Sequence, residues 1–138
     1  MHVKMLDHLN MTVSSLPRTV DWYARVFGFE LVEEGSHRGR PWGIIRSADA
    51  MLCIYEDPDR GSPELSEHAS HGVAHFGLRI DDRPSWEATV ARESVEVLYD
   101  GPVRWAHSTS WYVEDPNGYE IEVALWHHGR PHFGDEAP

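Results

Sequence analysis

The sequence of 138 residues contains one cysteine, few basic residues and no long apolar run. Because Cys53 cannot form a disulfide within the chain, the sequence does not fit a small disulfide-stabilised secreted domain, and we expect a cytoplasmic protein. No segment approaches the roughly 20 apolar residues that a membrane-spanning helix needs. The first residues also lack the pattern of a signal peptide. We therefore expect no membrane segment and no export.

The balance of charge is acidic. Twelve Lys and Arg stand against 23 Asp and Glu, which gives a formal net charge of −11 with His neutral. Negative charge repels nucleic acid phosphates and anionic lipid, so neither nucleic acid nor a membrane surface is an expected partner. Small molecules, metal ions and a second copy of the chain remain. Six Trp and 41% hydrophobic residues are enough for the core of a single domain spanning residues 1–138.

Hydrophobic periodicity predicts one module at about residues 4–56. Residues 6–13 alternate between apolar and polar as a strand does, and Ser15 and Pro17 then open a helix that ends before Gly28. The apolar stripe expected on this helix consists of Val20, Tyr23, Ala24 and Phe27. Strands follow at residues 29–33, 41–46 and 51–56, and the polar stretch 34–40 is expected to separate the first two.

The same order returns at about residues 71–126. We expect a strand at 73–80, a helix opened by Pro84 and extending to about residue 94, and strands at 95–99, 108–114 and 119–126. The spacing from His8 to Pro17 equals that from His75 to Pro84, which indicates an internal duplication. The predicted fold is therefore α+β, with two βαβββ modules joined by a linker at about 57–70 and followed by a tail at 127–138. The acidic residues at the start of the linker, Asp57 and Asp59, are expected to be solvated.

Metal-binding side chains stand at related positions of the two modules. Strand alternation puts His8 and His75 on the polar faces of the strands that open the modules, and Glu120 and Glu122 on the polar face of the last strand. Two imidazoles and one carboxylate on a shared sheet face are typical of sites for Fe(II), Mn, Ni or Zn that keep positions open for substrate. The alternative is that the histidines are half-buried strand residues with ordinary hydrogen bonds.

Four segments resemble the vicinal oxygen chelate superfamily, and the resemblance covers residues 5–126. They are residues 7–13 (DHLNMTV), 27–29 (FGF), 74–78 (AHFGL) and 112–122 (YVEDPNGYEIE). This superfamily includes glyoxalase I, extradiol dioxygenases, methylmalonyl-CoA epimerase, fosfomycin-modifying enzymes and bleomycin-binding proteins. The resemblance implies a curved mixed sheet around a metal-binding cleft and a homodimer. It also implies that His8, His75 and Glu122 hold a divalent metal ion, with Fe(II) favoured and Mn, Ni or Zn as alternatives.

The branch of the superfamily depends on a fourth ligand at the end of the first module. Glyoxalase I would need Glu or Gln on the metal side of strand 51–56, where alternation puts Cys53 and Tyr55 instead. Glu56 then points away, although a register slip of one residue would bring it inward. Cys53 is either a thiolate ligand or a small apolar strand residue. A site with three protein ligands favours dioxygenase-like or fosfomycin-type chemistry.

Other residues are candidates for catalysis and substrate binding. The resemblance to extradiol dioxygenases implies a catalytic hydrogen-bonding role for Tyr112 and for His107. Candidates for substrate binding are Asn10, which stands where fosfomycin-type enzymes carry Thr, Trp42, which could stack on an aromatic ring, and Arg104, which could bind an anion. His68 and His71 are further acid or base candidates through their position before the second module.

The sequence thus predicts a metal-dependent enzyme with dioxygenase-like chemistry on a small molecule that chelates the metal through adjacent oxygens. One alternative is a glyoxalase-like lyase or thiol transferase, including fosfomycin-type resistance. Another is a metal-free drug-binding module of the bleomycin-resistance type.

Overall fold

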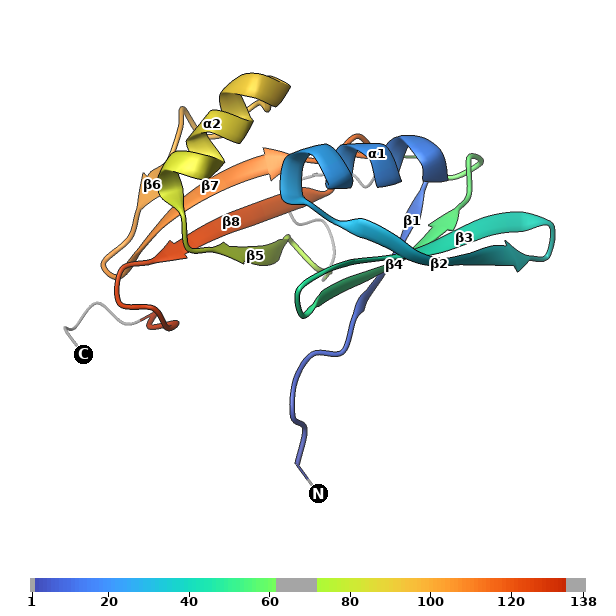
Figure 1. Cartoon of the computed structure of the whole chain (residues 1–138), viewed down its shortest axis with the longest axis horizontal. Coiled ribbons are helices and arrows are strands. Elements are labelled where there is room, and N and C mark those ends of the chain that lie inside the picture. The colour runs from blue at the N-terminus through green and yellow to red at the C-terminus, as the bar shows by residue number, and fades with distance from the viewer. Residues whose placement is uncertain (1, 62–71, 134–138) are drawn as a thin grey trace. The chain divides into compact units, whose positions relative to one another are not determined.

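The computed structural model describes residues 2–61 and 72–133. The chain divides into two compact units, Met1–Pro63 and Glu64–Pro138, and each contains one four-stranded sheet. Both units follow the order βαβββ, with the helix on one face of its sheet (Figure 1). The predicted α+β fold of two βαβββ modules is therefore confirmed. Most of the predicted linker and the end of the predicted tail, residues 62–70 and 134–138, lie outside the described residues.

The first unit is built around a mixed sheet. Its elements are β1 (Leu9–Val13), α1 (Leu16–Phe27), β2 (Glu30–His37), β3 (Arg40–Ser47) and β4 (Ala50–Glu56). The strand order is β1-β4-β3-β2, in which β1 is parallel to β4 and the other neighbours are antiparallel. The core lies between the sheet and α1, and its fully buried members include Tyr23, Ile45 and Ile54.

Helix α1 is capped by Ser15 and ends before Gly28, as the sequence predicted. The Ser15 side chain accepts a hydrogen bond from the Arg18 amide, and Gly28 ends the helix with a φ of 71°, a left-handed conformation that glycine adopts without strain. The buried stripe consists of Leu16, Thr19, Tyr23 and Val26. The expected stripe was wrong at Ala24, which is exposed, because this position lies about 100° around the helix from Tyr23.

The separation of β2 from β3 by a polar stretch was also wrong. Residues 34–37 continue β2, and β3 begins at Arg40, so the hairpin turns within Arg38 and Gly39. Both residues have positive φ, 51° and 75°, as a two-residue hairpin loop requires. Polar residues are tolerated here because β2 is the edge strand of its sheet and is exposed along its length.

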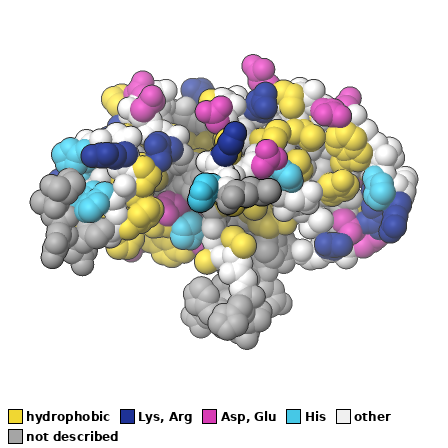
Figure 2. All heavy atoms as spheres, turned by 90° about the horizontal axis from the view of Figure 1, so that it is seen from below, with side chains coloured by type: hydrophobic (Ala, Val, Ile, Leu, Met, Phe, Trp, Pro, Cys, Tyr) yellow, Lys and Arg dark blue, Asp and Glu magenta, His cyan; other side chains and the backbone are white. Residues whose placement is uncertain are grey.

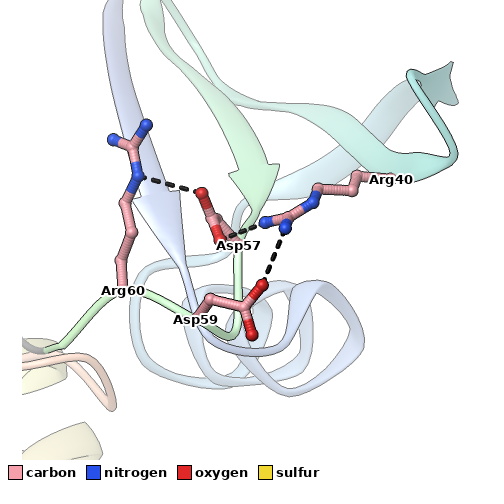
Figure 3. A network of polar contacts seen from close by, with 4 residues as sticks. All are labelled: Arg40, Asp57, Asp59 and Arg60. Carbon is pink, nitrogen blue, oxygen red and sulfur yellow. Dashed lines mark hydrogen bonds and ion pairs between the residues drawn. The ribbon is translucent and has the colours of Figure 1, made fainter.

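Arginine side chains hold the residues that follow β4 (Figure 3). Arg40 donates hydrogen bonds to Asp57 and to Asp59, and Arg60 forms an ion pair with Asp57 at 2.9 Å. Burial acts to raise the pKa of Asp57, but the hydrogen bond from Arg40 and the charges of both arginines outweigh it and lower that pKa. Asp57 and Asp59 therefore belong to a charged network that joins β3 to the chain after β4. The Asp59 side chain is 80% exposed, as we expected of a solvated surface, whereas that of Asp57 is only 20% exposed.

The second unit repeats this plan with a shorter edge strand. Its elements are β5 (Phe76–Ile80), α2 (Arg83–Glu93), β6 (Val103–Arg104), β7 (Ser108–Glu114) and β8 (Glu120–Trp126). The strand order is β5-β8-β7-β6, with β5 parallel to β8. The Asp82 side chain caps α2 by accepting from the Ser85 amide at 3.0 Å. The buried residues Trp86, Trp111, Val113, Ile121 and Val123 form the core of this unit.

The strand predicted at residues 95–99 was wrong. Only an isolated bridge joins Val97 to Val113, and β6 forms the edge of the sheet instead. Tyr99, Asp100 and Gly101 all have positive φ, at 58°, 64° and 116°, so the chain turns sharply where the strand was expected to end. The hydrophobic pattern of residues 95–99 contains no signal for this turn. The nearest signal is Gly101, which follows the turn's first two residues.

The loop between β7 and β8 is held by one buried carboxylate. Asp115 is 5% exposed, and its Oδ1 accepts hydrogen bonds from the Asn117 amide at 2.8 Å and the Tyr119 amide at 2.9 Å. Because buried backbone donors need partners, these bonds fix the loop. The register that results pairs Tyr112 with Glu122.

Two surface properties bear on partners. On the face drawn in Figure 2, Lys and Arg are scattered among Asp and Glu. Neither helix in the described part of the chain is long and apolar enough to cross a membrane.

Candidate functional site

The second unit brings several of the predicted residues together on one face of its sheet. Glu122 lies on β8 between Gly77 of β5 and Tyr112 of β7 in the strand register. Its neighbours in sequence, Ile121 and Val123, are fully buried on the opposite face. Gly77 places no side chain opposite Glu122, and His75 stands two residues before Gly77, just outside β5.

The two oxygens of the Glu122 carboxylate have separate partners. Oε2 lies 3.0 Å from Nε2 of His75, and Oε1 accepts a hydrogen bond of 2.6 Å from the Ser110 hydroxyl. The His75 side chain is 35% exposed and the Glu122 side chain 22%, so a ligand can reach both groups while the protein still fixes them. The Ser110 hydroxyl, which is fully buried, orients the carboxylate in the way that outer partners orient metal ligands.

The chemistry and spacing of this pair fit a divalent metal ion. Imidazole nitrogen and carboxylate oxygen bind such ions at about 2.0–2.2 Å. Two ligands at right angles around one ion then lie about 3.0 Å apart, which is the separation of His75 Nε2 and Glu122 Oε2. A separation of 3.0 Å is also that of a hydrogen bond, and in this structure a hydrogen bond joins His75 and Glu122. Within residues 2–61 and 72–133, no three His, Cys, Asp or Glu side chains gather as a complete set of metal ligands.

Tyr112 borders the His75–Glu122 pair. Its ring packs edge-on against the His75 imidazole, with ring centroids 5.6 Å apart, and also contacts Tyr99 at 5.3 Å. Burial and then the negative charge of Glu122 raise the pKa of Tyr112, so its phenol keeps its proton at neutral pH and can donate a hydrogen bond. The hydrogen bond from Tyr99 to Glu120, at 2.8 Å, likewise raises the pKa of Tyr99.

A pocket of about 280 Å³ opens beside these groups within the second unit. Glu122 and Tyr112 lie on its wall together with His107, which is 8% exposed. The pocket is also lined by Trp105, Ala106, Ser108, Trp126, His132 and Phe133. His132 and Phe133 come from the segment after β8, where the sequence showed no periodicity and predicted only a tail.

The remaining predicted ligand, His8, belongs to the first unit. It precedes β1, and its Nδ1 lies 2.7 Å from a carboxylate oxygen of Asp7. A carboxylate on one ring nitrogen is the arrangement that commonly orients a metal-binding imidazole through the other nitrogen. Asn10 and Cys53 are partners in the β1–β4 register, and Trp42 pairs with Tyr55 and lies over Gly35. Burial raises the pKa of the Cys53 thiol, which disfavours the thiolate that metal binding needs.

Of three other candidates, one lies on the opposite face of the sheet from Glu122 and two lie outside the described residues. Arg104 pairs with Thr109 on β7, one residue out of step with Ser108, Ser110 and Tyr112, and so lies on the other face of the sheet. His68 and His71 are outside the described residues.

Glu56 has a structural partner. Its Oε2 accepts a hydrogen bond of 2.7 Å from the amide of Leu16, the first residue of α1. A carboxylate at this position satisfies an amide that has no partner inside the helix, and it interacts favourably with the helix dipole. Glu56 therefore lies on the helix side of the first sheet, as strand alternation predicts.

Comparison with known proteins gives the family. The family model described as Glyoxalase/Bleomycin resistance protein/Dioxygenase superfamily matches residues 5–123. The chain belongs to this superfamily. Its resemblance to the vicinal oxygen chelate proteins is thereby confirmed.

The individual relatives of this chain are distant from it in sequence. A catechol-2,3-dioxygenase of Bacillus subtilis is 25% identical over 118 residues, which are 86% of this chain but 40% of that protein. A lactoylglutathione lyase of Neisseria meningitidis serogroup A is 26% identical over 125 residues, which are 85% of this chain and 87% of that protein. The solved glyoxylase/bleomycin resistance protein/dioxygenase domain from Frankia has the same fold, with a TM-score of 0.77 at 14% identity over 94% of this chain and 96% of its own.

The position of Glu56 leads to a prediction. Replacing Glu56 with Ala removes the partner of the Leu16 amide and should destabilise the protein by about 1 kcal/mol in urea unfolding. The exposed Glu34→Ala on β2 is the matched control and should change stability little. Both variants should retain the metal content of the wild type. Metal loss in Glu56→Ala alone would show that Glu56 is a ligand.

Alkaline pH gives a second prediction. The fold disfavours the phenolates of Tyr112 and Tyr99, whereas in the unfolded chain both phenols ionise near pH 10. Their contribution to stability is therefore complete below about pH 10 and falls as pH rises through and above it. Tyr112→Phe should lose less stability than wild type between about pH 9 and 11 in urea unfolding, and adding Tyr99→Phe should reduce the loss further. Equal losses in all three proteins would contradict this.

Proposed function

We propose that the protein is a divalent-metal-dependent enzyme with dioxygenase-like chemistry. Its substrate is a small molecule that chelates the metal through two adjacent oxygens, such as a catechol. The observation that supports the proposal most strongly is the Glu122 carboxylate, with Ser110 on one oxygen and His75 at ligand spacing on the other. The proposed ligands are His75, Glu122 and His8, and Fe(II) is the favoured ion, with Mn, Ni or Zn as alternatives.

A metal ion held by these ligands would supply Lewis acidity and, if it were iron, the means of reacting with dioxygen. The protein supplies orientation and proton transfer. Ser110 holds Glu122 with one oxygen turned towards His75. The protonated Tyr112 phenol donates a hydrogen bond to a substrate oxygen. His107, on the pocket wall, exchanges a proton with that substrate oxygen. Asn10 and Trp42 of the first unit are proposed substrate contacts.

A glyoxalase-like lyase is the second candidate. The similarity to the lactoylglutathione lyase extends over 87% of that protein, whereas the similarity to the catechol dioxygenase extends over 40% of it. One observation argues against a lyase. The Glu56 carboxylate, which would complete a four-ligand site, accepts a hydrogen bond from the Leu16 amide. A thiol transferase of the fosfomycin type and a metal-free drug-binding module are the remaining alternatives. The proposal also includes a cytoplasmic homodimer.

Elemental analysis and oxygen uptake test the proposal together. We expect about one iron per chain in untagged wild type and catechol-dependent oxygen consumption. His75→Ala, Glu122→Gln and His8→Ala should each lose most of the metal and at least about 100-fold of the activity, because each removes a ligand.

Glu120→Gln is the matched control, since Glu120 lies two residues from Glu122 on the same strand and is hydrogen-bonded to Tyr99. It should keep the metal. Nickel or zinc with thiol-dependent activity would favour the lyase or the transferase. A protein that takes up no metal after reconstitution would contradict the proposal and favour the binding module.

A further inference from the structure

Tyr99 lies against Tyr112 in a backbone conformation that tyrosine rarely adopts. Its φ is 58°, and that of the following residue, Asp100, is 64°. The left-handed region is open to glycine and, at some cost, to asparagine and aspartate, whereas a bulky residue there is an outlier. Tyr99 is also 62% exposed, so burial of its ring does not account for this conformation. Strained residues of this kind cluster at functional sites.

The backbone before Tyr99 is attached to the strand that carries Tyr112. Val97 forms an isolated bridge with Val113, and the Leu98 amide donates a hydrogen bond of 2.8 Å to the carbonyl oxygen of Tyr112. The chain then turns at Tyr99, whose ring packs edge-on against the Tyr112 ring with centroids 5.3 Å apart. Aromatic pairs prefer such edge-to-face geometry, and the contact restricts how either ring can move.

The hydroxyl of Tyr99 is held by Glu120. It donates a hydrogen bond of 2.8 Å to Oε1 of Glu120, on the strand that also carries Glu122. This bond raises the pKa of Tyr99, so the phenol keeps its proton and continues to donate at neutral pH. A hydrogen bond to a carboxylate is stronger than one between neutral groups. The Tyr99 side chain is therefore fixed between β7, through its ring, and β8, through its hydroxyl.

These contacts form a continuous series that ends at the candidate metal ligand His75. Glu120 holds Tyr99, and Tyr99 packs on Tyr112. The Tyr112 ring in turn packs edge-on against His75, with centroids 5.6 Å apart. Tyr112 is among the described residues that line the pocket of the second unit, whereas Tyr99 and Glu120 are not. Any effect of Tyr99 on a bound molecule therefore passes through Tyr112.

We propose that Tyr99 and Glu120 are positioning residues that hold the Tyr112 ring in the orientation from which its hydroxyl donates to the substrate. This inference rests on the proposed function for the role of Tyr112. Without the bond to Glu120, the exposed Tyr99 ring can leave Tyr112, and the Tyr112 phenol then takes up more orientations. Because a hydrogen bond depends on alignment, the loss should appear in the rate of reaction and not in substrate affinity.

Oxygen uptake with catechol tests the inference in the metal-loaded protein. Tyr99→Phe keeps the ring but removes the donor, and Glu120→Ala removes the acceptor. Each variant should retain the metal content and the KM of the wild type while kcat falls about tenfold, because an interaction made in the transition state is weakened. Glu114→Ala is the matched control, since Glu114 is exposed and stands opposite Glu120 in the strand register, and it should leave kcat unchanged.

A double variant separates positioning from a general structural role. If Tyr99 acts through Tyr112, then adding Tyr99→Phe to Tyr112→Phe should change kcat by less than about twofold. A further loss of about tenfold in the double variant would overturn the inference. Wild-type kcat in Tyr99→Phe and Glu120→Ala would also overturn it. So would an equal loss in Glu114→Ala, because that result would indicate an effect of charge without the hydrogen bond.

A measurement without substrate keeps the inference separate from the proposed function. NMR of protein with isotope-labelled tyrosine gives signals from five Tyr, and Tyr112→Phe identifies the signal of Tyr112. Glu120→Ala should move this signal and Glu114→Ala should not, because only the first change releases the Tyr99 ring. A Tyr112 signal that stays in place in Glu120→Ala would overturn the inference. A moved signal in a protein without oxygen uptake would support the positioning and contradict the dioxygenase-like activity.

Discussion

The site of the second unit depends on how the two oxygens of one carboxylate are held. A free glutamate side chain turns about several bonds, and a metal ligand of that kind would lose conformational entropy on binding. Ser110 removes this freedom by donating to Oε1, so that Oε2 lies 3.0 Å from His75. The hydroxyl and the imidazole come from different segments, β7 and the residue before β5. The arrangement therefore requires correct strand register on both sides of β8.

That register is fixed by the loop after β7. The buried Asp115 accepts from two amides of the loop and thereby sets which residue of β8 stands opposite Tyr112. A shift of one residue would turn Glu122 to the core face and bring Ile121 or Val123 to the open face. Burial of these two residues opposes the shift, because each is fully enclosed in the core. Turn chemistry and core packing thus specify the same register.

The two units use a carboxylate on a parallel-paired strand for different purposes, and Glu56 ends β4 whereas Glu122 lies near the start of β8. In the first unit, Glu56 shares a face with Leu52 and Ile54, which are buried, and so it reaches the first amide of α1. In the second unit, Glu122 alternates with the buried residues and faces away from them. The face of the strand on which the carboxylate lies thus decides whether it caps a helix or is a candidate metal ligand, although both units have the same order of elements.

Much of the fold could be predicted from the sequence because its signals are local. Ser15, Gly28, Asp82 and the Asp115–Gly118 turn mark boundaries through side chain to backbone hydrogen bonds or a left-handed conformation, and these positions act alike in any context. Strand alternation likewise predicted that Glu56 points to the helix.

The rest depends on contacts between distant segments. The short strand β6 is defined only by its pairing with β7, and residues 34–37 are strand only because β3 pairs with them. The contribution of His132 and Phe133 to the pocket follows from packing on His107 and Trp126, for which the sequence has no periodic signal. His75 and Glu122 could be proposed as ligands from parity and resemblance, but the role of Ser110 requires the β7–β8 register.

The most direct test of the account is a crystal structure of the metal-loaded protein, with the ion located by its anomalous scattering. We expect one ion within about 2.0–2.2 Å of both His75 Nε2 and Glu122 Oε2, with Ser110 still hydrogen-bonded to Oε1 and His8 completing the protein ligands. An ion held elsewhere, or bound by Glu56 or Cys53 in place of Glu122, would contradict the account.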